Sequence, residues 1–409
     1  MEIGGNGLYG ALSAAVAEAV VRFAAAAGAS SRDPLAVASD GSPAAAILAR
    51  AASAAVRSRG CPVLTGGALP PGAVRDLLTR RPLGGALMLG TPAPGRIGIV
   101  LFGADGRDAA ADRMAALWEA YDNGSAPGSP TAETALPAET ACAEYLQSLA
   151  EGVDAAAIRA AHLSCAIDFG SAAAEALGEA FAKTFGLHLL RFRGDGAAAA
   201  RAALQLDLTA AFGFSPDGGG LLVGGAAGEW LPAEAGFSLA ADSRCRRAGG
   251  GEAAITGSNG LLVEETLRRA GGRTTDEERE FYGAGAGFAY GGAPGFDAFR
   301  MAALLLECAA ASGRKLPELA HNLPPLHLVE AAIPWGEFGS DRIAALRGRL
   351  GEARMSRLGD TFRFDDASGR LSLRFDPATA TLAIVAAARR LNDARERLAD
   401  ALHLLGGAR

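Results

Sequence analysis

The chain has 409 residues, a formal net charge of −6, and 50% hydrophobic against 21% charged residues. This length predicts two to four domains rather than one core, and the composition is that of a globular protein. The negative charge disfavours nucleic acid and anionic lipid as partners. Because no apolar run reaches about 18 residues and the first residues do not resemble a signal peptide, we expect a cytoplasmic protein without a membrane span.

Short apolar runs alternate with alanine-rich stretches in the first part of the chain. The pattern predicts, in chain order, a helix at 11–27, a strand at 35–38, a helix at 44–57, a strand at 62–64, a helix at 72–79 and a strand at 86–89. Repeated strand–helix units with short apolar strands predict a mixed or parallel sheet with helices on both faces.

The strand–helix alternation recurs in two further parts of the chain and changes in the last part. A linker rich in Gly, Ser and Pro precedes residue 140, and predicted strands follow at 163–169, 189–192 and 208–214. A third round runs from about residue 254 through helices at 260–270 and 301–312. The last part has predicted helices at 340–350 and from 391, and strands at 361–364, 371–375 and 381–387. We therefore predict three similar mixed-sheet α/β domains and a smaller C-terminal α+β domain.

Residues 84–106 have the outline of a catalytic loop. An apolar strand ends in a Gly/Pro-rich turn that presents one hydroxyl, Thr91, and a second strand follows. This stretch resembles the active-serine loop of the α-D-phosphohexomutases, the phosphoglucomutase and phosphomannomutase family, where a strand ends in Thr-Ala-Ser-His-Asn-Pro. The positions of the phosphoserine, the His, the Asn and a following Lys are occupied by Thr91, Pro92, Ala93 and Val100.

The resemblance implies a four-domain fold around a central cleft, with one functional motif from each domain. On this pattern the predicted domains are 1–138, 139–236, 237–325 and 326–409. The motif of the second domain holds Mg²⁺ with three aspartates. Here only Asp217 remains, because Ser215 and Gly219 take the places of the other two. A single carboxylate is a poor Mg²⁺ site, so we predict a hairpin turn instead.

The motifs of the third and fourth domains are also incomplete. The sugar-recognition loop, Gly-Glu-x-Ser-Gly-His in the family, keeps only its glycine framework at Gly283, Gly285 and Gly287. In the phosphate-binding loop Arg374 is able to pair with a phosphate, but Asp376 stands where the family has a serine donor. A surface pair between Arg374 and Asp376 is the alternative interpretation.

Loss at all four motifs predicts a phosphohexomutase homologue without mutase activity, which acts as a binding, scaffold or regulatory protein. We expect no cofactor, and we expect neither Mg²⁺ nor a hexose phosphate to stabilise the fold appreciably. The expected partner is another protein, such as an enzyme of sugar-nucleotide or polysaccharide metabolism, or a second copy of the chain. One alternative is a mutase that uses phosphothreonine at Thr91. Another is an enzyme with new chemistry, whose candidate residues are Thr91, Asp217, Tyr9, Ser39, Asp40 and Arg374.

Other reactive residues give weaker signals. The five cysteines include no Cys-x-x-Cys pair, so we interpret them as reduced thiols, mostly in the core. The five histidines lack metal-ligand spacing. The basic run from Arg244 to Arg247 is interpreted as a solvated connection between domains, with an anion contact as the alternative.

Overall fold

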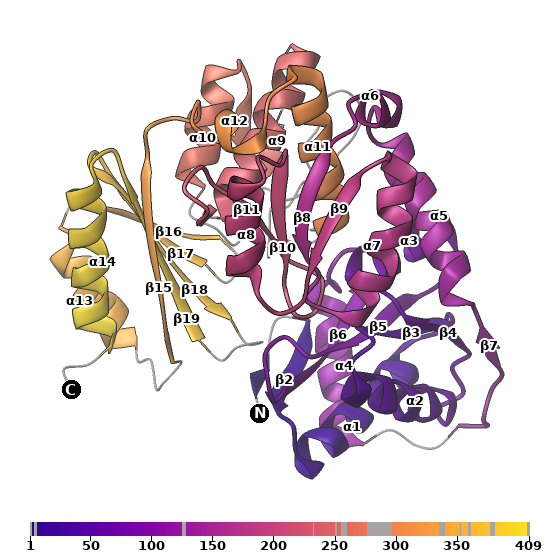
Figure 1. The fold of residues 1–409 in the computed structure, drawn as a ribbon. Helices are drawn as coiled ribbons and strands as arrows, with labels where there is room; N and C mark the ends of the chain where they lie inside the picture. The colour runs from indigo at the N-terminus through magenta and orange to yellow at the C-terminus, as the bar shows by residue number, and fades with distance from the viewer. Residues whose placement is uncertain are drawn as a thin grey trace.

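The structure is a computed structural model that describes residues 2–3, 6–124, 128–231, 233–249, 252–254, 260–275, 297–334, 340–351, 353–358, 361–376 and 381–406 (Figure 1). Within these ranges the strands form four sheets, and helices pack against them. The predicted mixed α/β class with a C-terminal α+β part is confirmed. The exact domain boundaries remain predictions.

The first sheet has helices on both faces, and its strands follow the order β1-β2-β6-β5-β3-β4-β7. The bounds of β1 to β7 are Glu2–Ile3, Gly7–Ala11, Leu35–Ser39, Val63–Ala68, Gly85–Gly90, Arg96–Gly103 and Glu133–Ala135. Successive side chains of a strand point to opposite faces. Accordingly Leu35 and Val37 of β3 pack with α1, α2 and α4, whereas Ala36 and Ala38 pack with α3 and α5. The bounds of α1 to α5 are Ala14–Ser30, Pro43–Arg57, Pro71–Arg80, Ala111–Asn123 and Ala138–Glu151.

The second sheet follows the order β12-β11-β10-β8-β9. Its strands β8 to β12 are Ser164–Asp168, His188–Phe192, Ala210–Phe214, Leu221–Gly224 and Trp230–Leu231. β8 is parallel to β9 and β10, and β10 turns back into antiparallel β11. α7 (Ala172–Phe185) covers one face within the large core that continues from the first sheet, and α8 (Gly196–Gln205) covers the other through a small alanine cluster. α6 (Ala155–Ala160) precedes β8.

The third part is mainly helical in the described residues. α9 (Ala233–Ala248), α11 (Ala298–Ser312) and α12 (Leu316–Ala320) add to the same large core. α10 (Leu261–Arg269) packs on α9, and the short strands β13 (Glu252–Ala254) and β14 (Arg273–Thr275) pair in parallel.

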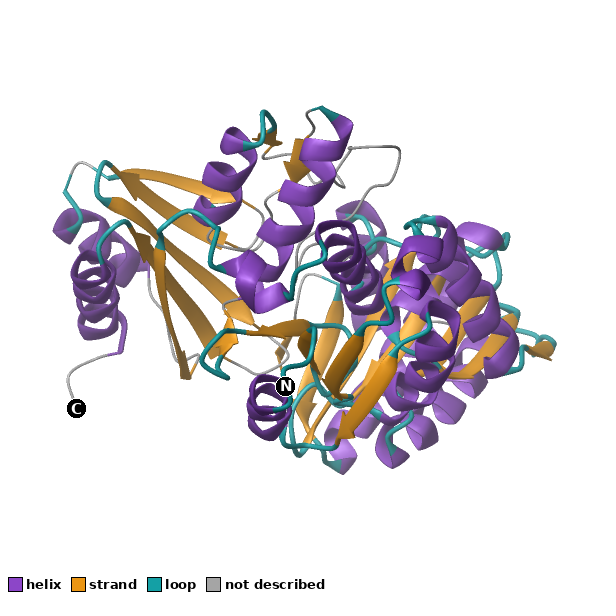
Figure 2. Ribbon diagram, turned by 45° about the horizontal axis from the view of Figure 1, so that its top comes forward, coloured by secondary structure: helices purple, strands orange, loops and turns teal. Residues whose placement is uncertain are grey.

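The fourth sheet is antiparallel throughout and follows the order β15-β19-β18-β17-β16. Strands β15 to β19 are His327–Pro334, Arg354–Leu358, Thr361–Asp366, Gly369–Asp376 and Thr381–Ala388. α13 (Ser340–Arg349) and α14 (Leu391–Gly406) cover one face, where Phe364, Leu371 and Leu373 form a separate core. Figure 2 shows this sheet with its two helices on the side away from the rest of the chain.

The basic run beginning at Arg244 is not a solvated connection, and that interpretation was wrong. It lies in α9, where Arg244 is buried and pairs with the Glu307 carboxylate of α11. Arg247 pairs with the same carboxylate at 2.6 Å. A buried carboxylate requires cationic partners, which the sequence run alone does not reveal.

The expectation of mostly buried cysteines that form no disulfides is confirmed, since four of the five are buried and all are free thiols. No helix among the described residues is both long enough and apolar enough to cross a membrane.

Candidate functional site

The loop around Thr91 connects two antiparallel strands. β5 ends at Gly90, the turn covers residues 91–95, and β6 begins at Arg96. Gly95 has a φ of +72°, a conformation that glycine adopts readily. The predicted strand, tight turn and returning strand are therefore present.

Asp40 holds the Thr91 loop. Its Oδ2 accepts hydrogen bonds from the Thr91 amide at 2.6 Å and from the Thr91 hydroxyl at 2.7 Å, and its Oδ1 accepts from the Ser42 amide at 2.8 Å. Asp40 is only 1% exposed. The contact follows from the topology: β3 and β5 are parallel neighbours with Ser39 opposite Leu89, so the residues after each strand meet at one sheet edge.

Asp217 closes the hairpin between β10 and β11. The Ser215 hydroxyl donates to Asp217 Oδ1 at 2.5 Å, and the Gly219 amide donates to the same oxygen at 3.0 Å. The Gly220 amide donates in turn to the Ser215 hydroxyl at 2.6 Å. Gly218 has a φ of +74°. The predicted hairpin turn at Asp217 is confirmed by the antiparallel pairing of the two strands.

These two loops converge at Gly90. A Cβ atom placed on Gly90 would lie 3.4 Å from Asp40 Oδ2 and 3.6 Å from the Asp217 Cβ. The Ala173 amide, at the start of α7, also donates to the Asp40 carbonyl at 3.1 Å. One hydroxyl and two carboxylates from loops that are far apart in the sequence thus share one small region.

This region is acidic. Within the part of the chain that the structure describes, Asp40 and Asp217 are held by hydroxyl and amide donors, and neither forms an ion pair. The same described residues contain no group of three or more His, Cys, Asp or Glu that could hold a metal ion. Two like unit charges about 4 Å apart repel by roughly 4 kcal/mol at an effective dielectric constant of 20. A further negative charge in this region would therefore be repelled unless a cation accompanied it.

Tyr9 and Ser39 make contacts that stabilise the first sheet. Tyr9 lies in β2 opposite Gly98, and a Cβ on Gly98 would meet the Tyr9 ring at 2.4 Å, so the ring packs directly on this glycine. Ser39 is buried, and its carbonyl accepts a hydrogen bond from the Leu69 amide.

The remaining predicted site residues do not join the Thr91 region. Arg374 is half-buried in β18, opposite Thr361 of β17 and Ala383 of β19. No hydrogen bond or ion pair among the described residues links Arg374 to Thr91, Asp40 or Asp217. Gly283, Gly285 and Gly287, and the Asp376 side chain, lie outside what the structure describes.

Sequence reasoning missed a group of arginines on the fourth sheet. Arg354, Arg363, Arg370 and Arg389 line one cavity between this sheet and α10. A signal was present, because the segments 361–365 and 369–374 alternate apolar with polar residues and so direct Arg363 and Arg370 to one face. What the sequence does not contain is which element lies opposite that face.

The comparisons with known proteins concern the fold. No protein-family model matches the sequence, and no curated protein matches it significantly. The structure is similar to a protein described as a phosphomannomutase from Thermus thermophilus, with a TM-score of 0.76, 18% identity and full coverage of both chains. It is also similar to a phosphoglucomutase/phosphomannomutase family protein from Burkholderia thailandensis, with a TM-score of 0.72, 17% identity, and 99% of this chain and 97% of that chain covered.

A third similar structure is the Paramecium exocytosis-sensitive phosphoprotein parafusin, a phosphoglucomutase. It has a TM-score of 0.68 and 11% identity, with 98% of this chain and 94% of that chain covered. The chain therefore has the phosphohexomutase fold over its whole length.

Proposed function

We propose that this chain, which has the phosphohexomutase fold, is a divergent member of the α-D-phosphohexomutase superfamily without mutase activity. In this proposal it acts as a binding, scaffold or regulatory protein in the cytoplasm. Its partner is an enzyme of sugar-nucleotide or polysaccharide metabolism or a second copy of the chain. The net charge of −6 argues against nucleic acid as the partner.

The Asp40–Thr91 contact carries the proposal. A phosphoryl group on Thr91 would break the 2.7 Å hydrogen bond from its hydroxyl to Asp40 Oδ2. It would also place a dianion beside Asp40 and close to Asp217, which lack ion-paired cations within the described chain. Loss of one well-placed electrostatic contact typically costs about 10²–10³ in rate, so loss of several should remove measurable turnover, although such effects need not add.

A turnover assay tests the proposal. The purified protein would be given glucose 1-phosphate or mannose 1-phosphate with the bisphosphate activator and Mg²⁺, and the 6-phosphate would be measured. We expect no turnover, and a rate above about 1 s⁻¹, ordinary for an enzyme, would refute it. Thr91→Ser should not restore activity, because Asp40 would hold the serine hydroxyl in the same way.

A second candidate function is hydrolytic or transfer chemistry at the same residues. The hydroxyl of Thr91 points at a carboxylate that could accept its proton, and a second carboxylate lies close by. Intact-mass spectrometry distinguishes the two. A stable covalent adduct on Thr91 after incubation with phosphoryl or acyl donors, lost in Thr91→Val, would favour this alternative and contradict a non-catalytic role.

A further inference from the structure

The fourth sheet has one apolar and one strongly polar face. The alternation along β17 and β18 places Phe364, Leu371 and Leu373 against α13 and α14. The opposite face carries Arg363 and Arg370, which are only 3% and 7% exposed. Burying a guanidinium is costly unless it is paired or hydrogen-bonded, so the charged groups opposite this face decide what it can bind.

A cavity of about 620 Å³ lies between this polar face and α10. Ligand sites for small molecules usually measure about 300–1,000 Å³. Its cationic and hydroxyl lining consists of Arg354, Ser356, Arg363, Ser368, Arg370 and Arg389. The cavity lies at the Arg370 end of β18. Arg374 is four residues further along the same strand, which corresponds to roughly 13 Å. It is therefore separate from the Arg374 end of the strand, whose sequence resembles a phosphate-binding loop.

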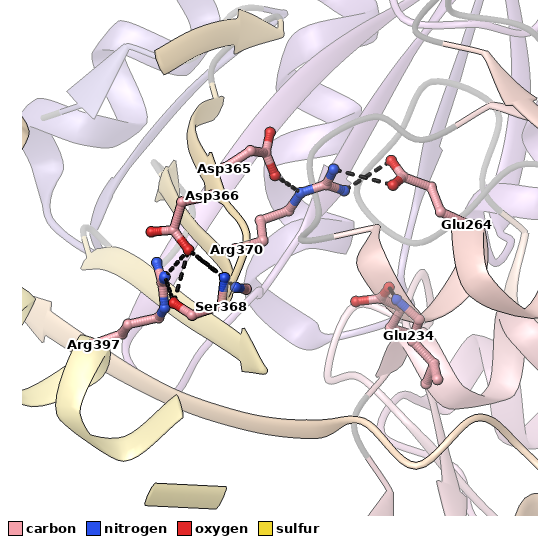
Figure 3. A network of polar contacts seen from close by, with 9 residues as sticks. Glu234, Glu264, Asp365, Asp366, Ser368, Arg370 and Arg397 are labelled. Carbon is pink, nitrogen blue, oxygen red and sulfur yellow. Dashed lines mark hydrogen bonds and ion pairs between the residues drawn. The ribbon is translucent and has the colours of Figure 1, made fainter. Parts of the chain in front are cut away.

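The carboxylates of the lining already have cationic partners. Arg370 donates to both oxygens of Glu264, at 2.8 and 3.1 Å, and also pairs with Asp365 (Figure 3). Arg268, one turn further along α10, pairs with Glu265 at 2.6 Å. Each of these three acids thus has an arginine partner, and Arg370 is shared between Glu264 and Asp365.

Asp366 is neutralised in the same way. Its carboxylate pairs with Arg397 of α14 and accepts from Ser368, as Figure 3 shows. Burial alone would raise the pKa of Asp366, but the hydrogen bonds from Arg397 and Ser368 outweigh it and lower the pKa to about 2. The Asp366 carboxylate is therefore ionised at neutral pH and is already bound by Arg397 and Ser368.

Arg354 and Arg389 supply the remaining positive charge. Both are exposed lining residues that form no ion pair within 4 Å with a residue in the described ranges, and the charge of Arg389 also helps to lower the pKa of Glu265 in the same lining. The lining also carries the hydroxyl of Ser356. Guanidinium groups bind phosphate oxygens through paired hydrogen bonds, and hydroxyls add further donors.

We propose that this cavity binds a small phosphorylated metabolite through Arg354 and Arg389, beside the Arg370–Glu264 pair. The cavity is formed by α10 and the fourth sheet, so binding would fix the position of one relative to the other. The site does not depend on the loss of mutase activity at Thr91. The expectation that hexose phosphates do not bind was drawn from the four motif loops and does not cover this cavity.

Isothermal titration calorimetry of the full chain with pyrophosphate tests the proposal. We expect saturable binding that weakens at least tenfold in the double variant Arg354→Gln/Arg389→Gln. Both positions are exposed, so the variant should fold, which its unliganded melting temperature would check. The matched control is Arg374→Gln, an arginine on the same face at the other end of β18, which should bind pyrophosphate as the unaltered protein does.

Three results would overturn the proposal. The first is no binding of pyrophosphate at 10 mM. The second is binding that Arg374→Gln abolishes and the double variant leaves intact, which would locate it at the Arg374 end of β18. The third is citrate bound as tightly as pyrophosphate with the same dependence on the double variant, which would make the site a carboxylate site.

Discussion

At the residue scale, Asp40 decides what Thr91 can do. Three donors depend on the Asp40 carboxylate, namely the Thr91 amide, the Thr91 hydroxyl and the Ser42 amide. Asp40→Ala should therefore lower the free energy of unfolding by roughly 2–3 kcal/mol, because a buried donor left without a partner costs about 1–3 kcal/mol. Thr91→Val removes only the hydroxyl and should cost roughly 1 kcal/mol. Urea denaturation measures both, and a larger effect of Thr91→Val would contradict this order.

The Asp40–Thr91 contact could not be predicted from the sequence. The two residues are 51 positions apart, and they meet only because β3 and β5 are parallel neighbours in the sheet. By contrast, the turn at Asp217 was predictable, because Asp-Gly between two apolar runs is a local signal. Local turn chemistry is visible in the sequence, and contacts that depend on strand order are not.

Glu234 is a second residue whose environment has a measurable consequence. It is buried, its Oε1 accepts from the Leu262 amide at 2.7 Å at the start of α10, and its Oε2 has no hydrogen-bond partner within the described ranges. Burial raises the pKa of Glu234 to about 7, although the Val263 and Leu262 amides and the charge of Arg370 act in the opposite direction. The folded protein thus binds this proton more tightly than the unfolded chain does.

The sign of the pH dependence follows. A carboxyl whose folded pKa is raised stabilises the fold below its ordinary pKa of 4.5, and this contribution is lost as the pH rises through about 7. Glu234→Gln keeps an acceptor oxygen without the charge. Between pH 5 and pH 8 the variant should therefore lose roughly 2–3 kcal/mol less stability than the unaltered protein. The control is Glu119→Gln, an exposed position on α4; equal pH profiles for Glu234→Gln and the unaltered protein would show that Glu234 is not the responsible group.

At the element scale, the close approach of α1 and α2 depends on a glycine. A Cβ on Gly28 of α1 would lie 2.9 Å from both the Cα and the carbonyl oxygen of Val56 in α2. Gly28→Ala should therefore lower the free energy of unfolding by about 1 kcal/mol or more, because overpacking typically costs 1–3 kcal/mol and outweighs the helix propensity gained. Thermal denaturation measures this change.

Gly348 provides the matched control. It also lies inside a helix, α13, but a Cβ there would meet nothing within 4 Å. Gly348→Ala should raise stability by roughly 0.5–1 kcal/mol, because only the helix propensity changes. If both alanines shifted the melting temperature in the same direction, close packing of α1 on α2 would not explain the need for glycine at Gly28.

The predictable elements are those with a long or two-sided apolar pattern. The helix at 44–57 and the strand at 35–38 were predicted within about one residue of α2 and β3. β15 and β16 were not predicted, and both are edge strands of the fourth sheet. An edge strand is only partly covered, so charged residues such as Arg354 and a terminal Pro334 occur where a central strand would be apolar.

At the scale of the whole molecule, Glu307 connects three helices. Its carboxylate pairs with Arg244 at 3.2 Å and Arg247 at 2.6 Å, both from α9, and accepts from the Asp154 amide at 2.8 Å at the start of α6. Burial alone would raise the pKa of Glu307, but these hydrogen bonds and charges lower it. Its contribution to stability is therefore present at neutral pH and is lost as the pH falls below the ordinary glutamate range, opposite in sign to that of Glu234.

Neutralising Glu307 should weaken this junction strongly. Removal of one partner from a buried ion pair typically costs about 3–5 kcal/mol, and Glu307→Gln leaves the buried Arg244 without its counter-charge while still accepting from the Asp154 amide. We expect a loss of roughly 3 kcal/mol at pH 7, and a smaller loss as the pH falls below the ordinary glutamate pKa of 4.5, because the stability that comes from the lowered pKa of Glu307 fades there. The matched control is Glu318→Gln, whose side chain is 51% exposed and lies 3.5 Å from Arg314. Exposed pairs contribute about 0–1 kcal/mol, so equal losses for the two variants in chemical denaturation would show that Glu307 does not hold the three helices together.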